Sequence, residues 1–120
     1  MQHTILGQEK NIAYIEISEK INDVQSALDF IMSANYETNC SRLVLDKSCF
    51  ADEFFVLSSG LAGEVLQKFV TYHVKMAIVG DYSGYTSKPL KDFIYESNRG
   101  NHFFFVPTLE EAVAKLEAAK

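Results

Sequence analysis

Residues Val74 to Gly100 read VKMAIVGDYSGYTSKPLKDFIYESNRG. The apolar run that opens this stretch predicts a strand buried on both faces, and Gly80 with Asp81 predicts its abrupt end. Ser87 and Pro89 predict a helix with the serine as its N-cap and the proline in its first turn. The small polar residues between the strand and the helix form a loop, in which we expect a ligand or partner to bind.

Apolar runs of strand length recur on both sides of this unit. The run RLVLD, Arg42 to Asp46, is continuous, as in a central strand, whereas Ile12 to Ile17 alternates, as in a half-buried strand. The remaining strands are expected at His3 to Leu6 and at His102 to Val106. Because strands alternate with helical segments, we predict one α/β domain over residues 1–120. Its mixed, mostly parallel sheet has about five strands, about four helices and an N-terminal β-hairpin.

The first helix is expected to begin at Asn22, with Gln25 completing a capping box, and to end near Tyr36. Spacings of three and four residues predict its core face. That face consists of Val24, Leu28, Ile31, Met32 and Asn35.

The second helical segment contains an interruption, Ser58-Ser59-Gly60. Either Asp52 to Leu57 is a separate turn and the helix begins at Ser58, or small residues let another backbone approach closely. In the second case the close approach is expected at Ser59, Gly60 and Gly63.

Composition argues against several classes of function. The chain has 11 Lys and Arg against 16 Asp and Glu, a net charge of −5, and no basic run, so nucleic acid is not expected as a partner. No segment has the length and apolarity of a membrane span, and we expect a cytoplasmic protein that does not bind membranes. Cys40 and Cys49 are expected to be free thiols. They form no zinc spacing with the histidines, so neither a metal nor another cofactor is predicted.

Two longer patterns extend over much of the chain. They read FF-x-L-x-x-GLAGE-x-LQKF and VK-x-AIVGDYS-x-Y-x-SK-x-LKDFIYESNRG. In these patterns the chain resembles a bacterial family described as domain of unknown function 4180. The resemblance covers nearly all residues and implies no particular activity.

The order of elements is similar to that of the SpoIIAA-like (STAS) proteins, where an LVLD strand precedes a DSSGLG turn and a helix. Here Leu43 to Asp46 and Ser58 to Leu61 repeat parts of that pattern, with Leu57 in place of the motif's aspartate. The resemblance implies a SpoIIAA-like fold, a regulatory role in protein–protein interaction, and phosphorylation at Ser58. A helix start would favour the added negative charge. Alternatively, Ser58 only caps a helix or fills a tight packing site.

Candidate site residues lie where two central strands end. Asp46 and Asp81 follow buried strands, and ligands collect beyond the carboxyl ends of such strands. If these strands are neighbours, the two carboxylates would line a polar crevice with Lys47, Ser83, Tyr85 and Lys88. Such a crevice could hold a cation, or the carboxylates could act as acid and base. Alternatively, each aspartate caps a turn or a helix. The residues expected to bind a ligand or partner are Asp81, Tyr82, Ser83, Tyr85, Ser87 and Lys88.

The positions of the serine, cysteine and histidine residues argue against nucleophilic catalysis. Ser58 or Cys49 would need a histidine close by, but His73 and His102 precede strands and should lie at the opposite end of the sheet. No catalytic residue is therefore assigned, and Asp46 and Asp81 remain the candidates.

Phe103 to Phe105 places rings on both faces of one strand, which predicts core packing. If a face lacks a helix, these rings and Tyr14 would instead form an exposed patch for a partner or a homodimer. Two functions follow from the sequence. The first is a non-enzymatic regulatory or interaction domain that binds a protein or small ligand. The alternative is a small hydrolase or transferase that uses Asp46 and Asp81, with Lys88 or Arg99 holding an anion.

Overall fold

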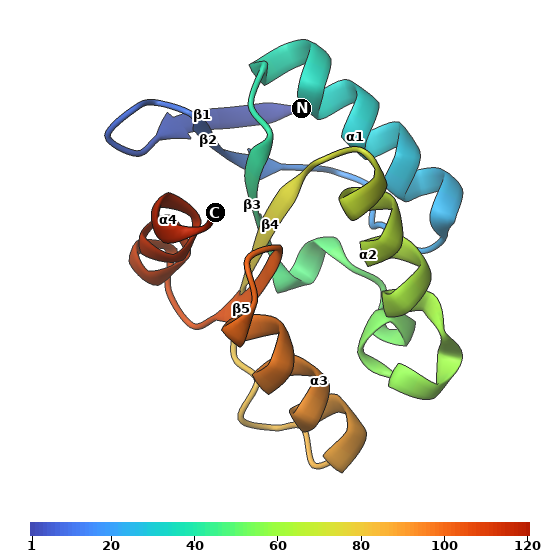
Figure 1. The fold of residues 1–120 in the computed structure, drawn as a ribbon. Coiled ribbons are helices and arrows are strands. Elements are labelled where there is room, and N and C mark those ends of the chain that lie inside the picture. The colour runs from blue at the N-terminus through green and yellow to red at the C-terminus, as the bar shows by residue number, and fades with distance from the viewer.

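Five strands form one sheet in the computed structural model, which describes all residues from 1 to 120. They are β1 (Gln2–Leu6), β2 (Ile12–Glu16), β3 (Arg42–Asp46), β4 (Lys75–Val79) and β5 (Phe103–Val106). The strand order β1-β2-β3-β4-β5 follows the chain, with β1 antiparallel to β2 and all other pairs parallel (Figure 1). The predicted α/β fold with a mixed, mostly parallel sheet and an N-terminal hairpin is confirmed.

Four α-helices surround the sheet. They are α1 (Val24–Thr38), α2 (Leu61–Thr71), α3 (Lys88–Arg99) and α4 (Leu109–Ala118). Three short 3₁₀ turns lie between β3 and α2: η1 (Lys47–Cys49), η2 (Asp52–Phe55) and η3 (Leu57–Ser59). None of the four helices combines the length and the apolarity that crossing a membrane requires.

The helices divide unequally between the two faces of the sheet. Right-handed crossovers between consecutive neighbouring strands place their helices on one side, and Figure 1 shows α1, α2 and α3 there, with α4 on the other side. The core under the first three helices contains 23 buried residues, whereas the core under α4 contains eight. One helix therefore carries the whole cover of the second face.

The start of α1 differs by one residue from the sequence prediction. Asp23, not Asn22, is the N-cap: its carboxylate accepts a hydrogen bond from the backbone N–H of Ser26 at 2.7 Å. The Ser26 hydroxyl in turn accepts one from the N–H of Asp23 at 3.1 Å. Ser26 thus takes the reciprocal position that was expected of Gln25, because a serine this close to the cap reaches the backbone directly.

The core face of α1 also lies beside the predicted one. Its buried residues are Ala27, Phe30, Ile31 and Ala34, whereas Met32 and Tyr36 are 53% and 90% exposed. The predicted face was chosen mainly from the positions of large apolar side chains. The alanines face inward because their small size lets the helix pack closely.

The interrupted segment is a series of separate turns, which confirms the separate turn of the first alternative but not its helix start. Gly60 has a positive φ of 80° and caps α2, which begins at Leu61 and not at Ser58. The Ser59 hydroxyl donates a hydrogen bond to the carbonyl of Glu53 and accepts one from the N–H of Leu61. No backbone approaches closely, because nothing lies within 4 Å of a Cβ built at Gly60 or Gly63.

The phenylalanines of β5 pack in the core on both faces. Phe104 lies under α4 and is 3% exposed, whereas Phe103 and Phe105 pack under the other helices. The alternative of an exposed patch formed by these rings with Tyr14 is therefore wrong, since α4 covers that face. Cys40 and Cys49 are buried and free, as expected.

The free edge of β5 is closed by a side chain of α3. His102 and Val106 direct their carbonyls at β4, so the backbone groups of Phe105 point away from the sheet. Asn98 satisfies both of them: its Nδ2 donates to the Phe105 carbonyl at 3.1 Å, and its Oδ1 accepts from the Phe105 N–H at 2.7 Å. The Asn98 side chain thus makes the two hydrogen bonds with Phe105 that a neighbouring strand would otherwise make.

We expect Asn98→Ala to lower the free energy of unfolding by about 1–2 kcal/mol, because two hydrogen bonds to a partly buried edge are lost. Asn98→Asp keeps an acceptor for the Phe105 N–H but loses the donor, and its loss should be intermediate. Urea denaturation measures both, with Glu96→Ala on the exposed side of α3 as the control. Equal stability of Asn98→Ala and the parent protein would contradict this role.

Candidate functional site

A hollow of about 500 Å³ lies at the carboxyl ends of β3 and β4. We call it the carboxyl-edge hollow. Residues from four parts of the chain line it, most of them charged, polar or aromatic. They are Lys20, Asp46, Lys47, Ser48, Phe50, Asp52, Phe55, Val79, Gly80 and Tyr85. The sequence placed a crevice at these strand ends, and the hollow occupies that position.

Lys47 crosses from the end of β3 to the end of β4. Its stem runs over Gly80: a Cβ built at Gly80 would lie 2.6 Å from the Cβ of Lys47. Its Nζ donates a hydrogen bond to the carbonyl of Asp81 at 2.9 Å. Because glycine leaves the room that the lysine stem needs, these two residues form one structural unit.

Three aromatic rings surround the Lys47 ammonium on one side, and we call Phe55, Tyr82 and Tyr85 the aromatic trio. Their centroids lie 5.6, 5.6 and 4.4 Å from Nζ, within the range of cation–π attraction. Phe55 comes from η2, and both tyrosines come from the loop after β4. The ammonium thus ties two segments that are distant in the sequence.

The two tyrosines of the trio have different surroundings. The hydroxyl of Tyr82 donates to the carbonyl of Ile78 at 2.9 Å, and burial, with the charge of Tyr85, raises its pKa well above the usual value. Tyr82 is therefore a structural residue that stays neutral. Tyr85 stacks on Phe55 with centroids 5.6 Å apart and lines the carboxyl-edge hollow. Of the two, Tyr85 is the ring that a ligand in the hollow would meet.

Asp46 and Asp81 are engaged with different partners. Asp46 lines the hollow, and its Oδ2 accepts a hydrogen bond from the hydroxyl of Tyr14 at 2.8 Å. This bond, together with burial, raises the pKa of Tyr14 to about 12. Asp81 accepts from the hydroxyl and the N–H of Ser83 at 2.6 and 2.9 Å, which lowers the pKa of its carboxyl. The Asp81 side chain does not line the hollow.

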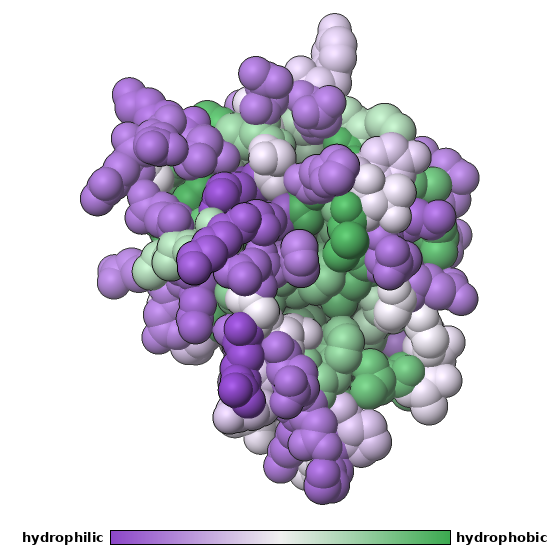
Figure 2. Space-filling view, in the orientation of Figure 1, coloured by the Kyte–Doolittle hydropathy of each residue, from purple (hydrophilic) through white to green (hydrophobic).

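The end of the loop meets the Ser58 turn. A second hollow of about 510 Å³, the Ser58 hollow, is lined by Phe55, Val56, Leu57, Ser58, Ser87 and Pro89. Ser58 itself is exposed and makes no cap hydrogen bond, whereas Ser87 caps α3 through the N–H of Leu90. Phe55 lines both hollows, so they share a wall. Figure 2 shows hydrophobic residues reaching the surface around these turns, while hydrophilic residues cover α3 and α4.

Lys88 and Arg99, the two cationic residues of α3 that were predicted to hold an anion, lie at its two ends. Lys88 forms an exposed ion pair with Asp92 at 2.7 Å, which raises its pKa. Arg99, eleven residues further along the same helix, lies 5.5 Å from the ring centroid of Tyr95. These two residues are not brought together around one anion.

The histidines and cysteines form no reactive group around the hollow. His73 connects α2 to β4 and His102 precedes β5, both at the amino ends of strands. Burial raises the pKa of the Cys49 thiol, which disfavours the thiolate. No three His, Cys, Asp or Glu side chains come together to hold a metal ion.

A family model described as "Domain of unknown function (DUF4180)" matches residues 7–116. The chain belongs to this family. Neither the curated proteins nor the solved structures yield a match. The matched range contains β2 to β5 and the whole of the carboxyl-edge hollow, while β1 lies before it. The likeness of this DUF4180 domain to SpoIIAA-like proteins stays a prediction.

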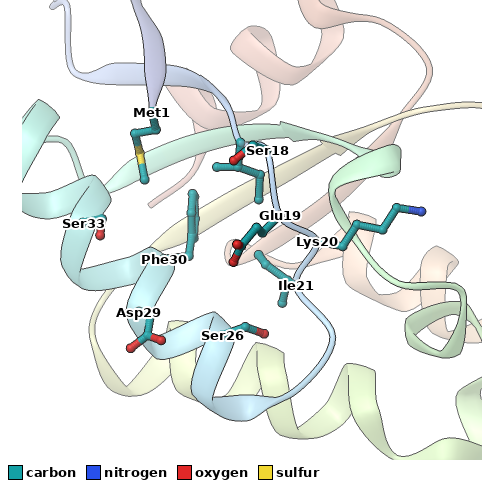
Figure 3. A pocket seen from close by; sticks show the side chains of 10 residues that line it. Met1, Ser18, Glu19, Lys20, Ile21, Ser26, Asp29, Phe30 and Ser33 are labelled. Carbon is teal, nitrogen blue, oxygen red and sulfur yellow. The ribbon is translucent and has the colours of Figure 1, made fainter.

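The DUF4180 domain has a third hollow, of about 290 Å³, which the sequence did not suggest. Figure 3 shows it between Met1, the connection from β2 to α1, and residues of α1 including Asp29 and Phe30. The Lys20 side chain points away from α1 in this view, and it also lines the carboxyl-edge hollow. The connection is held there because Ile21 pairs with the segment after β3, through hydrogen bonds to Cys49 and Ala51. Pairing of two loops leaves no periodic signal in the sequence.

Proposed function

We propose that this DUF4180 domain is a non-enzymatic binding domain of regulatory or interaction type, with its ligand or partner at the carboxyl-edge hollow. The observation that carries the proposal is the fixed position of the Lys47 ammonium over the aromatic trio. A flexible lysine gains specificity when its stem and head are both held in place. Here Gly80 accommodates the stem, while the Asp81 carbonyl and the three rings hold the head.

The lining of the hollow favours a ligand with polar and flat parts. The Lys47 ammonium donates one hydrogen bond within the protein and has two more protons to donate, and Lys20 adds a second cation. Asp52 supplies an acceptor, and Tyr85 offers a ring for stacking. A small molecule or peptide segment with an anionic group, a donor and a planar group would match these features.

The alternative of a small hydrolase or transferase has less support. Acid and base catalysis by two carboxylates needs both near one substrate atom. Asp46 is bonded to Tyr14 on β2, and Asp81 is bonded to Ser83 in its own loop, outside the lining of the hollow. Asp81 thus fits the turn-capping role that was its alternative, whereas the Asp46 side chain binds Tyr14 and makes no cap hydrogen bond.

Regulation through Ser58 belongs to the same proposal. Ser58 is exposed, and its hollow shares Phe55 with the carboxyl-edge hollow. A phosphate on Ser58 would place negative charge beside the start of α3, where the helix amides favour it. The added charge would lie next to a wall of the binding site and would alter ligand affinity.

A fragment titration followed by ¹H–¹⁵N NMR tests the binding site. Fragments that carry a carboxylate on an aromatic ring should shift the amides of Lys47, Gly80 and Tyr85. Tyr85→Ala should weaken this binding about tenfold, because a stacking surface is lost. Tyr95→Ala is the matched control, since Tyr95 is 62% exposed on α3 and lines neither hollow.

Two outcomes would count against the proposal. One is a set of shifts confined to the third hollow or to other surfaces. The other is unchanged affinity in Tyr85→Ala, provided its melting temperature shows that the domain is folded. Lys47→Gln serves as a second variant, because it removes the cation from the hollow and keeps most of the stem that lies over Gly80.

A further inference from the structure

The edge strand β1 has unpaired backbone groups. Lys75 N–H donates to Ser41 and Met76 N–H donates to His102, so alternate residues of β4 face its two neighbours. In the registers of β3, β2 and β1 the same alternation continues from strand to strand. The backbone N–H and C=O groups of the even-numbered residues of β1 therefore face β2. The N–H and C=O groups of His3 and Ile5 therefore point away from the sheet.

The two edges of the sheet differ in protection. At β5 the Asn98 side chain occupies the outward groups of Phe105. Strand β1, with the sequence QHTIL, has none of the usual protecting features: it contains no lysine, no proline and no carboxylate, and its register with β2 runs without a bulge. Its residues from Gln2 to Ile5 are exposed. An open, uncharged edge of this kind is a template for another strand.

We propose that β1 pairs antiparallel with β1 of a second copy of this chain, with a two-fold axis at Thr4. In this register Gln2 opposes Leu6, His3 opposes Ile5, and Thr4 opposes its own counterpart. It is the two-fold register in which every residue of β1 faces a residue of the other β1. The outward groups of His3 and Ile5 then form two hydrogen-bonded pairs.

The chemistry of β1 favours a second copy as the partner. The pairing is self-complementary, as a two-fold interface must be. Two threonines meet across the axis in a close, non-hydrogen-bonded pair, which is a favourable combination, and no charged side chain opposes a like charge. The result is a continuous sheet of ten strands, twice the five of one copy. The inference does not depend on the carboxyl-edge hollow, which lies at β3 and β4.

A charge exchange at Thr4 tests this interface. Thr4 is exposed, so Thr4→Lys and Thr4→Glu should each leave the fold intact. Sedimentation equilibrium should show the parent chain rising from 13.5 kDa toward twice that mass as its concentration increases. Each variant alone should dimerise about fivefold more weakly or worse, because like charges oppose one another across the axis. An equimolar mixture of the two variants should recover the dimer.

Amide exchange gives a second measurement. The His3 and Ile5 amides should gain protection with concentration in the parent chain and lose it in Thr4→Lys. Thr86→Lys, in the exposed loop before α3, is the control and should dimerise like the parent. A parent chain that stays at 13.5 kDa at all concentrations would overturn the proposal. So would variants that dimerise undiminished, a mixture that stays monomeric, or association without protection of these amides.

Discussion

Leu116→Ala is expected to lower the free energy of unfolding by about 2–5 kcal/mol, the cost of removing a fully buried leucine from a packed core. Leu116 has 0% exposure and lies on the side of α4 that faces the sheet, in the smaller of the two cores. The other buried residues of α4 and its C-cap, Ala112 and Ala119, are small. Leu116 is thus the one fully buried large side chain of this helix, and Leu109 and Val113 pack beside it while only partly buried.

The end of α4 is held in addition by Arg42 of β3. The guanidinium donates hydrogen bonds from Nη1 to the carbonyls of Leu116 and Ala119, the second at 3.1 Å. These are among the last carbonyls of the helix, which have no partner within it. A cavity at Leu116 would loosen the segment that Arg42 binds, so the variant should also expose Phe104 to solvent.

Chemical denaturation and amide exchange check this expectation. In Leu116→Ala the amides of α4 should exchange faster than those of α2. Leu109→Ala is the matched control, because Leu109 is a half-buried leucine in the same helix and should lose clearly less stability. Equal losses for the two leucines would contradict the role assigned to Leu116.

Gly80→Ala is expected to destabilise the domain by about 1–3 kcal/mol, because it overpacks the contact between the ends of β3 and β4. The new methyl group would lie 2.6 Å from the Cβ and 2.9 Å from the Cδ of Lys47. The Cβ of Lys47 is fixed to the backbone, so rotation of the lysine side chain cannot relieve the clash. The strand end or the lysine must shift, and the Nζ would then leave the aromatic trio.

Thermal unfolding measures this loss, and the NMR shifts of the Tyr85 ring report the displacement of Lys47. Gly84→Ala is the control: it lies in the same loop, has no atom within 4 Å of a built Cβ, and should change stability little. An unshifted Tyr85 ring in Gly80→Ala would show that Lys47 is not held by the glycine.

Much of the fold could be predicted from local pattern. The bounds of β3 at Arg42 and Asp46 agree with the prediction, because a central strand is an unbroken apolar run. The start of α3 was found from Ser87 and Pro89 alone. The face of α1 was not, because alanine carries little weight in a hydrophobic pattern although Ala27 and Ala34 are fully buried.

The sequence predicted where the candidate site lies better than it predicted which side chains contact one another there. The rule for the carboxyl ends of parallel strands predicted a crevice at Asp46, Lys47 and Asp81, and the first two line the hollow whereas the Asp81 side chain does not. The hydrogen bond from Tyr14 to Asp46 joins residues 32 apart, and that from Asn98 closes an edge that periodicity does not describe. The turn η2 directs the ring of Phe55 at Lys47, and no periodic pattern marks that contact in the sequence.

The strand order affects how the protein can fold during its synthesis. Each new strand of the sheet pairs with the one made just before it, so an emerging chain can add strands without waiting for a distant segment. Synthesis from the N-terminus would let the hairpin and the β2–α1–β3 unit form while the rest is still on the ribosome. The exception is α4, whose end returns to Arg42 across 74 residues. One face of the sheet therefore stays uncovered until α4 has been synthesised, and during that interval the apolar side chains of this face, such as Phe104, are open to aggregation with other chains.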